Sequence, residues 1–164
     1  MPGRSFEKIT VKDLRRLRDL AELDREDFFL RNPGTARLYA KRVFAVALCQ
    51  GAALHYVDKT NGVKDFDVWS FYGTHPTRMF PPRRRGIADF GDPKFGTTSN
   101  NPTFVGRRVD LIGRSIKARN FGDPVEVLCN YLRTRPTTSA KFLAEKAMVL
   151  LEPAHLLGTV IWPE

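Results

Sequence analysis

Cysteine is scarce in this chain of 164 residues, which contains only two. Cys49 and Cys129 do not form the closely spaced pairs of a zinc site, and both lie in apolar runs, which predicts buried free thiols. No apolar run approaches the roughly 20 residues that a transmembrane helix needs. The first residues contain no apolar signal region, so the sequence predicts a cytoplasmic protein with no membrane partner.

Several common catalytic motifs are also missing. The three histidines, His55, His75 and His155, are isolated, and no His-Glu-x-x-His pair is present. The sequence has neither the Gly-x-x-x-x-Gly-Lys phosphate-binding loop nor the Gly-x-Gly-x-x-Gly dinucleotide fingerprint. These absences argue against zinc proteases of that type, P-loop nucleotide hydrolases and dinucleotide-dependent oxidoreductases.

Positive charge is abundant and unevenly distributed. The formal net charge is +9, and residues 73–119 hold ten Lys and Arg against three acids. Such a basic segment is typical of proteins that handle polyanions, such as nucleotide phosphates or nucleic acid. A solvated basic surface that aids solubility is the alternative interpretation.

The length and an apolar fraction of 42% predict one domain over residues 1–164 with a substantial core. Residues 73–105, rich in Gly and Pro, read as a long basic insert. Apolar spacing and capping residues predict the following order: a helix over about 10–30, a short helix from Pro33, a strand over 43–49, a helix after Gly51, a strand through Asp65 and Asp67 to Tyr72, a strand over 107–116, a helix over about 124–135, and a last helix from Thr137 to Pro153. We therefore expect an α/β (α+β) fold, a small mixed β-sheet flanked by helices.

Two carboxylates lie two residues apart in the expected second strand. Successive side chains of a strand point to opposite faces, so Asp65 and Asp67 share one face while Phe66 and Val68 share the other. Two acids at this spacing repel each other, and Asp is a poor strand residue. A divalent cation between them would relieve the repulsion, and Mg²⁺ is commonly held by one or two carboxylates together with substrate phosphates. A third acid, Asp110, lies in the next strand-like run.

This arrangement resembles the nucleotidyltransferase superfamily, which has the DNA polymerase β-like minimal nucleotidyltransferase fold. In that family a hydrophobic strand ends in Gly-Gly or Gly-Ser, an Asp-x-Asp strand follows, and a third carboxylate lies on a later strand. Gly51-Ala52 takes the first position, Asp65-Phe66-Asp67-Val68 the second and Val109-Asp110-Leu111 the third. Ala52 departs from the pattern because it lacks the hydroxyl of Ser. The resemblance covers roughly residues 43–116.

The resemblance implies a fold and a chemistry. Asp65, Asp67 and Asp110 would be the catalytic residues and would hold Mg²⁺ or Mn²⁺, and Asp110 would also help to deprotonate the attacking hydroxyl. Gly51 and Ala52 would bind the triphosphate of an NTP such as ATP through backbone N–H groups. Basic side chains from 83–85 or 107–114, among them Arg83, Arg84 and Arg108, would neutralise the leaving pyrophosphate.

Three functions remain open from the sequence. The first is a metal-dependent nucleotidyltransferase that moves an NMP from an NTP to a hydroxyl of a small molecule, an RNA such as tRNA, or a protein. The second is a catalytically inactive module of the same fold that binds nucleic acid or a partner protein. The third, a metal-dependent nuclease, is disfavoured because Leu111-Ile112-Gly113 follows Asp110 in place of an acid-x-Lys pattern. The sequence does not determine the oligomeric state.

Overall fold

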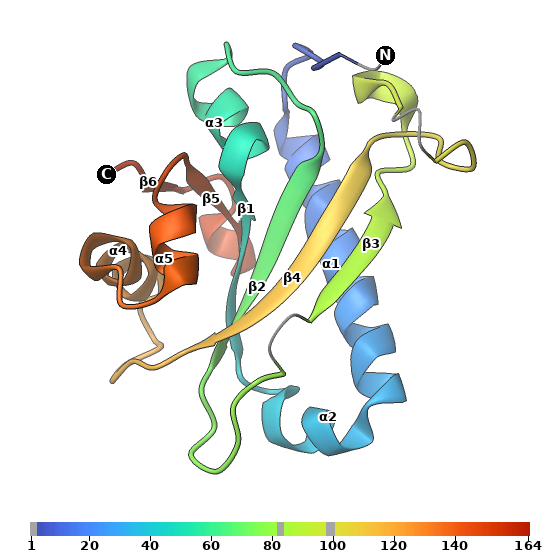
Figure 1. The fold of residues 1–164 in the computed structure, drawn as a ribbon. Coiled ribbons are helices and arrows are strands. Elements are labelled where there is room, and N and C mark those ends of the chain that lie inside the picture. The colour runs from blue at the N-terminus through green and yellow to red at the C-terminus, as the bar shows by residue number, and fades with distance from the viewer. Residues whose placement is uncertain (1–2, 82–83, 98–100) are drawn as a thin grey trace.

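The computed structural model describes residues 3–81, 84–97 and 101–164, and these residues form a mixed sheet with helices on both faces (Figure 1). The α-helices within them are α1 (Val11–Arg31), α2 (Pro33–Tyr39), α3 (Gln50–Asp58), α4 (Pro124–Thr134) and α5 (Thr138–Leu143). The strands are β1 (Val43–Cys49), β2 (Phe66–Gly73), β3 (Arg85–Asp89), β4 (Arg108–Ile116), β5 (Met148–Glu152) and β6 (Val160–Trp162). The expected α+β class with a mixed sheet is confirmed.

The six strands lie in the order β3-β4-β2-β1-β5-β6. β2 and β4 are parallel, and every other neighbouring pair is antiparallel. The β2–β4 register places Asp67 directly beside Asp110. Because neighbouring residues in a register point to the same face of the sheet, the topology itself brings these two acids together.

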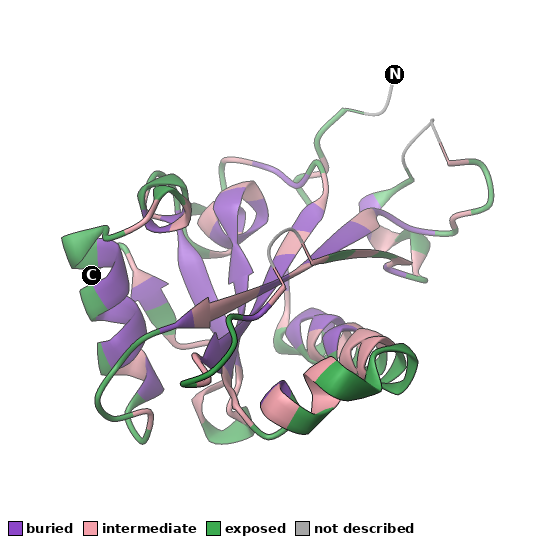
Figure 2. Ribbon diagram, turned by 60° about the horizontal axis from the view of Figure 1, so that its bottom comes forward, coloured by how far each residue is buried: buried purple, intermediate pink, exposed green. Residues whose placement is uncertain are grey.

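The two faces of the sheet are covered by different helices. α1 packs its buried residues Leu14, Leu17 and Ala21 against a cluster that includes Val68 of β2 and Leu111 of β4. α4 and α5 pack on the opposite face, in a second cluster. Figure 2 shows the buried residues following the strands and the inner sides of the helices. Asp67 lies on the face of Trp69 and Phe71, which belong to the α4–α5 cluster.

The start of α1 illustrates how local sequence fixes an element. The Thr10 side chain accepts a hydrogen bond from the Asp13 N–H, and the Asp13 carboxylate accepts one from the Thr10 N–H. This reciprocal capping box satisfies N–H groups that have no acceptor within the helix. The helix predicted over about 10–30 is therefore confirmed, with bounds one residue away.

One expectation about secondary structure is wrong. Residues 148–152 form strand β5 rather than the end of a helix that continues to Pro153. Met148 to Leu151 are all buried, since β5 pairs with β1 on one side and β6 on the other, and this pairing overrides a helical pattern of apolar residues. The insert over 73–105 contains β3, which pairs with β4 along Arg85–Asp89.

No helix among the described residues combines the length and the apolar composition that crossing a membrane requires.

Candidate functional site

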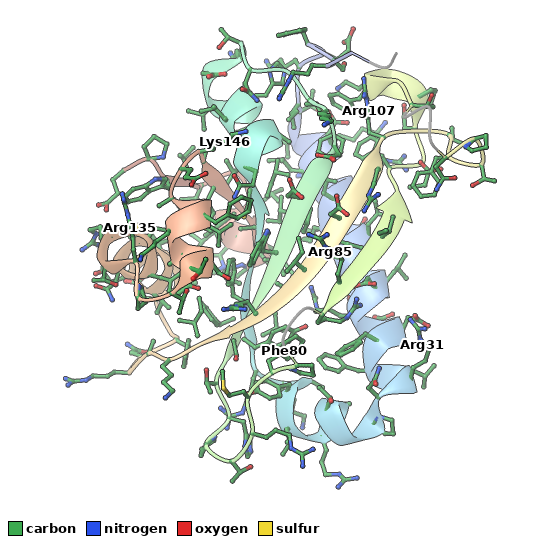
Figure 3. All side chains as sticks on the ribbon, in the orientation of Figure 1. Arg31, Phe80, Arg85, Arg107, Arg135 and Lys146 are labelled. Carbon is green, nitrogen blue, oxygen red and sulfur yellow. The ribbon has the colours of Figure 1, made fainter. Side chains whose placement is uncertain are left out.

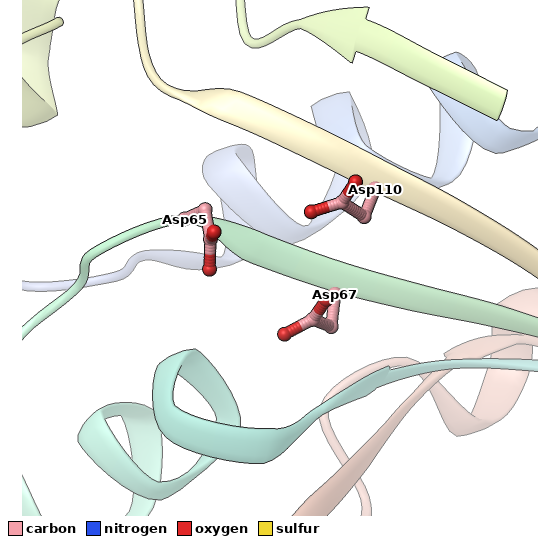
Figure 4. A group of neighbouring side chains, drawn as sticks. All are labelled: Asp65, Asp67 and Asp110. Atoms are coloured by element: carbon pink, nitrogen blue, oxygen red, sulfur yellow. The ribbon is translucent and has the colours of Figure 1, made fainter. Parts of the chain in front are cut away.

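Three aspartates from two adjacent strands converge at one point of the sheet (Figure 4). Asp65 directly precedes β2, Asp67 is the second residue of β2, and Asp110 is the third residue of β4. One carboxylate oxygen from each lies within 4.8 Å of the others. The structure thus brings together the three acids that the sequence singled out, and the cluster could hold a metal ion.

The oxygens of this cluster fit a hard divalent cation. No described residue donates a hydrogen bond to Asp65 or Asp67, while Asp110 receives both of its bonds, from Arg108, on Oδ1 alone. Asp110 Oδ2 is therefore available although the residue is only 6% exposed. Two ligands on opposite sides of Mg²⁺ lie about 4.2 Å apart, so only a small side-chain movement is needed to bind one ion. Carboxylate-only ligation favours Mg²⁺, Mn²⁺ or Ca²⁺ over softer metals.

The positive charges near the cluster do not fully offset the burial of Asp67 and its repulsion by the other two acids. Burial, together with the neighbouring charges of Asp65 and Asp110, raises the pKa of Asp67 to about 6. Arg85 and Lys146 act in the opposite direction and lower the pKa of Asp67. A bound dication would attract all three carboxylates. It would therefore offset their mutual repulsion and favour the charged form of each acid.

The turn from β1 into α3 lies beside the aspartates. Cys49, the last residue of β1, pairs with Asp67 in the register, and α3 begins immediately afterwards. Gln50 takes the left-handed conformation, with φ of 62°, which is uncommon for a residue other than glycine. Its N–H donates to the Ala147 carbonyl (3.1 Å), and its side-chain amide donates to the Phe142 carbonyl (3.3 Å). The turn is thus held in a strained conformation by partners from the C-terminal part of the chain.

The first turn of α3 has the geometry of an anion site. The N–H groups of Gly51 and Ala52 belong to this turn, where N–H groups have no acceptor within the helix and the dipole favours negative charge. The Ala52 methyl group is buried in the core, so the missing hydroxyl of Ser leaves the N–H groups unaffected. A Cβ on Gly51 would lie 3.6 Å from an Arg4 nitrogen and 3.8 Å from Lys146 Nζ. Two cations therefore flank this helix end.

Backbone contacts place these two cations. Lys146 directly precedes Ala147, whose carbonyl accepts the Gln50 N–H, and Figure 3 shows it beside α3. Arg4 precedes Ser5, which exchanges two backbone hydrogen bonds with Val63, at 2.9 and 2.7 Å. Neither residue carries a local sequence signal, because both reach the site through pairing between distant segments. The sequence analysis missed both of them.

The arginines predicted to bind nucleotide are distributed differently. Arg108 lies on the aspartate face and pairs with Asp110 at 2.8 Å. Arg84 lies over α1, where it pairs with Asp24 at 2.6 Å and stacks on the Phe28 ring, so the structure does not bring it to the cluster. Arg83 lies outside the described residues. Arg85, which the sequence analysis included only within a range, is exposed and lies on the face of the aspartates.

Arg107 stabilises the backbone next to the aspartate cluster. It is 4% exposed, and its guanidinium donates to the carbonyls of Phe95 (2.6 Å), Lys64 (3.2 Å) and Gly3 (2.6 Å). These bonds tie the N-terminal segment and the residue before Asp65 to the start of β4. Burial lowers the pKa of Arg107, and the nearby charge of Asp65 opposes this change. Arg107 is therefore a structural anchor rather than an exposed cation.

Two other groups near the site are explained by packing. Cys49 is a buried free thiol, and burial together with the charge of Asp67 raises its pKa well above the ordinary value, so it is a poor nucleophile. His55 is buried, its Nδ1 accepts from the Gly62 N–H at 3.0 Å, and its Nε2 lies 2.9 Å from the Glu7 carbonyl. The expectation of a buried free thiol at Cys49 is confirmed.

No family model matches this sequence, and comparisons with curated proteins and with solved structures also find no significant match. The function must therefore be argued from the geometry of the site.

Proposed function

We propose that this protein is a Mg²⁺- or Mn²⁺-dependent nucleotidyltransferase that moves an NMP from an NTP to a hydroxyl group. The observation that carries the proposal is the juxtaposition of three convergent carboxylates with the cation-flanked first turn of α3. The phosphates of an NTP bind both divalent cations and helix N-termini, so an NTP would use the carboxylates and the first turn of α3 together.

Each residue has a distinct task in this proposal. Asp65 and Asp67 would hold the ions that contact the triphosphate, and Asp110 would hold the ion nearer the attacking hydroxyl. Gly51 and Ala52 would bind phosphate oxygens through their N–H groups, with Lys146 and Arg4 neutralising charge there. Divalent ions bound at such a site supply charge stabilisation for the attacking and leaving oxygens of an in-line displacement.

The reaction balances without any further cofactor. The acceptor oxygen forms a bond to the α-phosphorus, and the bond from that phosphorus to the bridging oxygen breaks, which releases pyrophosphate. Asp110, the carboxylate nearest the attacking hydroxyl in this proposal, would help to take the acceptor proton. Arg85 is exposed on the same face and would neutralise charge on the phosphates.

Label position tests this chemistry. The protein is incubated with Mg²⁺ or Mn²⁺, bulk tRNA or a cell lysate, and NTPs labelled on either the α- or the γ-phosphate. The proposal predicts an acceptor that gains label from the α-phosphate only, and no gain with Asp67→Asn. Asp19→Asn, an exposed acid on α1, is the matched control and should transfer label like the wild type.

Binding separates the proposal from its alternatives. Calorimetric titration with Mn²⁺ and a nonhydrolysable NTP should give binding that Asp67→Asn loses. No binding by either protein would support the inactive binding module and contradict the proposal. RNA cleavage without label transfer would instead support the nuclease.

A further inference from the structure

A large cavity lies on the same face of the sheet as the aspartates but at the other end of β4. Its volume is about 760 Å³, and it is lined by the end of β4, the segment after it, and α4. Ile116 ends β4 six residues after Asp110, which corresponds to about 20 Å at roughly 3.3 Å per residue. The cavity is therefore a separate site, beyond the phosphates that the aspartate cluster would hold.

The walls of this cavity are mainly apolar. Ile116, Val127 and Tyr131 contribute their buried side chains, and Pro136 closes one side. The Tyr131 hydroxyl lies 2.8 Å from the Thr137 hydroxyl, so its polar end already has a hydrogen-bond partner. A concave, mostly apolar site of this size with a few polar groups is typical of small-molecule binding.

The free charge at the rim is positive. Lys117 and Arg119 line the cavity, are exposed, and form no ion pair within the part of the chain that the structure describes. Of the two acids that line it, Glu126 pairs with Arg133, while Asp123 accepts the Glu126 N–H as the cap of α4 and keeps its charge, so two cations face one acid that has no ion pair among the described residues. A ligand would therefore meet an apolar interior and two available cations.

We infer that this cavity is a second ligand site, which binds a small molecule with an aromatic or aliphatic body and an anionic group. The body would fill the apolar interior, and the anionic group would pair with Lys117 and Arg119 at the rim. The inference does not depend on the metal chemistry proposed above, because no residue of the aspartate cluster lines the cavity.

Two dyes that differ in charge test this inference. Calorimetry of the full chain compares 8-anilinonaphthalene-1-sulfonate, an aromatic anion, with N-phenyl-1-naphthylamine, its neutral analogue. We expect saturable binding of one anionic dye per chain, weakened about tenfold in Lys117→Gln/Arg119→Gln, since each lost ion pair contributes a few-fold. Lys12→Gln/Arg15→Gln, which removes the same charge from exposed positions of α1, should leave binding unchanged.

A second variant tests the cavity itself. Asn130 is exposed on α4 and lines the cavity, so Asn130→Trp should fill it and abolish binding, whereas Lys141→Trp, on α5 and outside the cavity, should not. Asp67→Asn should bind the anionic dye like the wild type, which separates this site from the proposed active site. The inference is overturned if neither dye binds, if both dyes bind equally, or if Asn130→Trp and Lys117→Gln/Arg119→Gln leave binding intact while circular dichroism shows them folded.

Discussion

Replacing Asp67 by Asn should make the metal-free protein more stable while removing its affinity for metal. Asp67 has a pKa of about 6 in the folded protein, against an ordinary value of 3.8, because burial and two neighbouring acids disfavour its charge. Asn has nearly the same shape and carries no charge. The substitution therefore removes an electrostatic penalty that the folded state has and the unfolded state does not.

The sign of the pH dependence follows from the raised pKa. Between pH 3.8 and about 6, the folded state binds more protons at Asp67 than the unfolded state does. The contribution of Asp67 to stability is therefore fully present below the lower pKa and is lost as pH rises through the upper one. The loss amounts to at most about 3 kcal/mol, since one unit of pKa corresponds to about 1.4 kcal/mol.

Urea unfolding in a metal chelator measures this effect. Relative to the wild type, Asp67→Asn should raise the free energy of unfolding by up to about 3 kcal/mol at about pH 8, but by only about 1 kcal/mol at about pH 4.5. Adding Mn²⁺ at 100 times its dissociation constant should stabilise the wild type by about 2.7 kcal/mol and the variant much less. Asp19→Asn, at an exposed position, should show neither difference.

Two results would contradict the expected gain in stability of Asp67→Asn. If Asp67→Asn is no more stable than the wild type at about pH 8, the three carboxylates do not repel each other in the folded protein. If its advantage is the same at both pH values, the effect does not arise from the charge of Asp67.

Three further substitutions test the surroundings of the site. Lys146→Gln should lower the affinity for a nonhydrolysable NTP about tenfold, measured by calorimetry, since it removes one charge-assisted contact. It should also shift Mn²⁺ binding to higher pH, because Lys146 lowers the pKa of Asp67. Gly51→Glu should abolish binding of the same NTP analogue yet retain Mn²⁺, since its carboxylate would pair with Arg4 and Lys146. Arg107→Met should lower the free energy of unfolding by about 2–4 kcal/mol in urea, because three carbonyls lose their donor.

Matched controls keep these results interpretable. Lys141→Gln, an exposed position on α5, should bind the NTP analogue and Mn²⁺ like the wild type. Gly51→Ala adds only a Cβ that would lie 3.0 Å from the Asn61 amide, so it should perturb binding much less than Gly51→Glu. An unchanged affinity in Gly51→Glu would contradict the placement of phosphates at α3, and an unchanged stability in Arg107→Met would contradict its role as an anchor.

The three aspartates of the site could be predicted from the sequence because each lies in a short stretch with a recognisable strand pattern. Asp65 and Asp67 share a strand face by the period of two, and Asp110 lies in a second strand-like run of the same character. The parallel pairing of β2 and β4, which places Asp67 beside Asp110, is a property of the assembled sheet and has no local signal in the sequence.

The cations of the site could not be predicted in the same way. Lys146 lies between α5 and β5, in a stretch whose apolar pattern predicts a helix, and only the pairing of β5 with β1 brings it beside Gly51. Conversely, Arg84 follows two Pro residues in a basic run, yet it packs on α1 because Asp24 and Phe28 provide a partner there. Charge runs in a sequence thus predict that cations are near an anion site but not which of them reach it.

The most direct test of the proposed metal and nucleotide site is an anomalous difference map from crystals grown with Mn²⁺ and a nonhydrolysable NTP. We expect Mn²⁺ density between Asp65, Asp67 and Asp110, with the triphosphate against the first turn of α3. Density for the ion or the nucleotide elsewhere, with none among the three aspartates at saturating Mn²⁺, would contradict it.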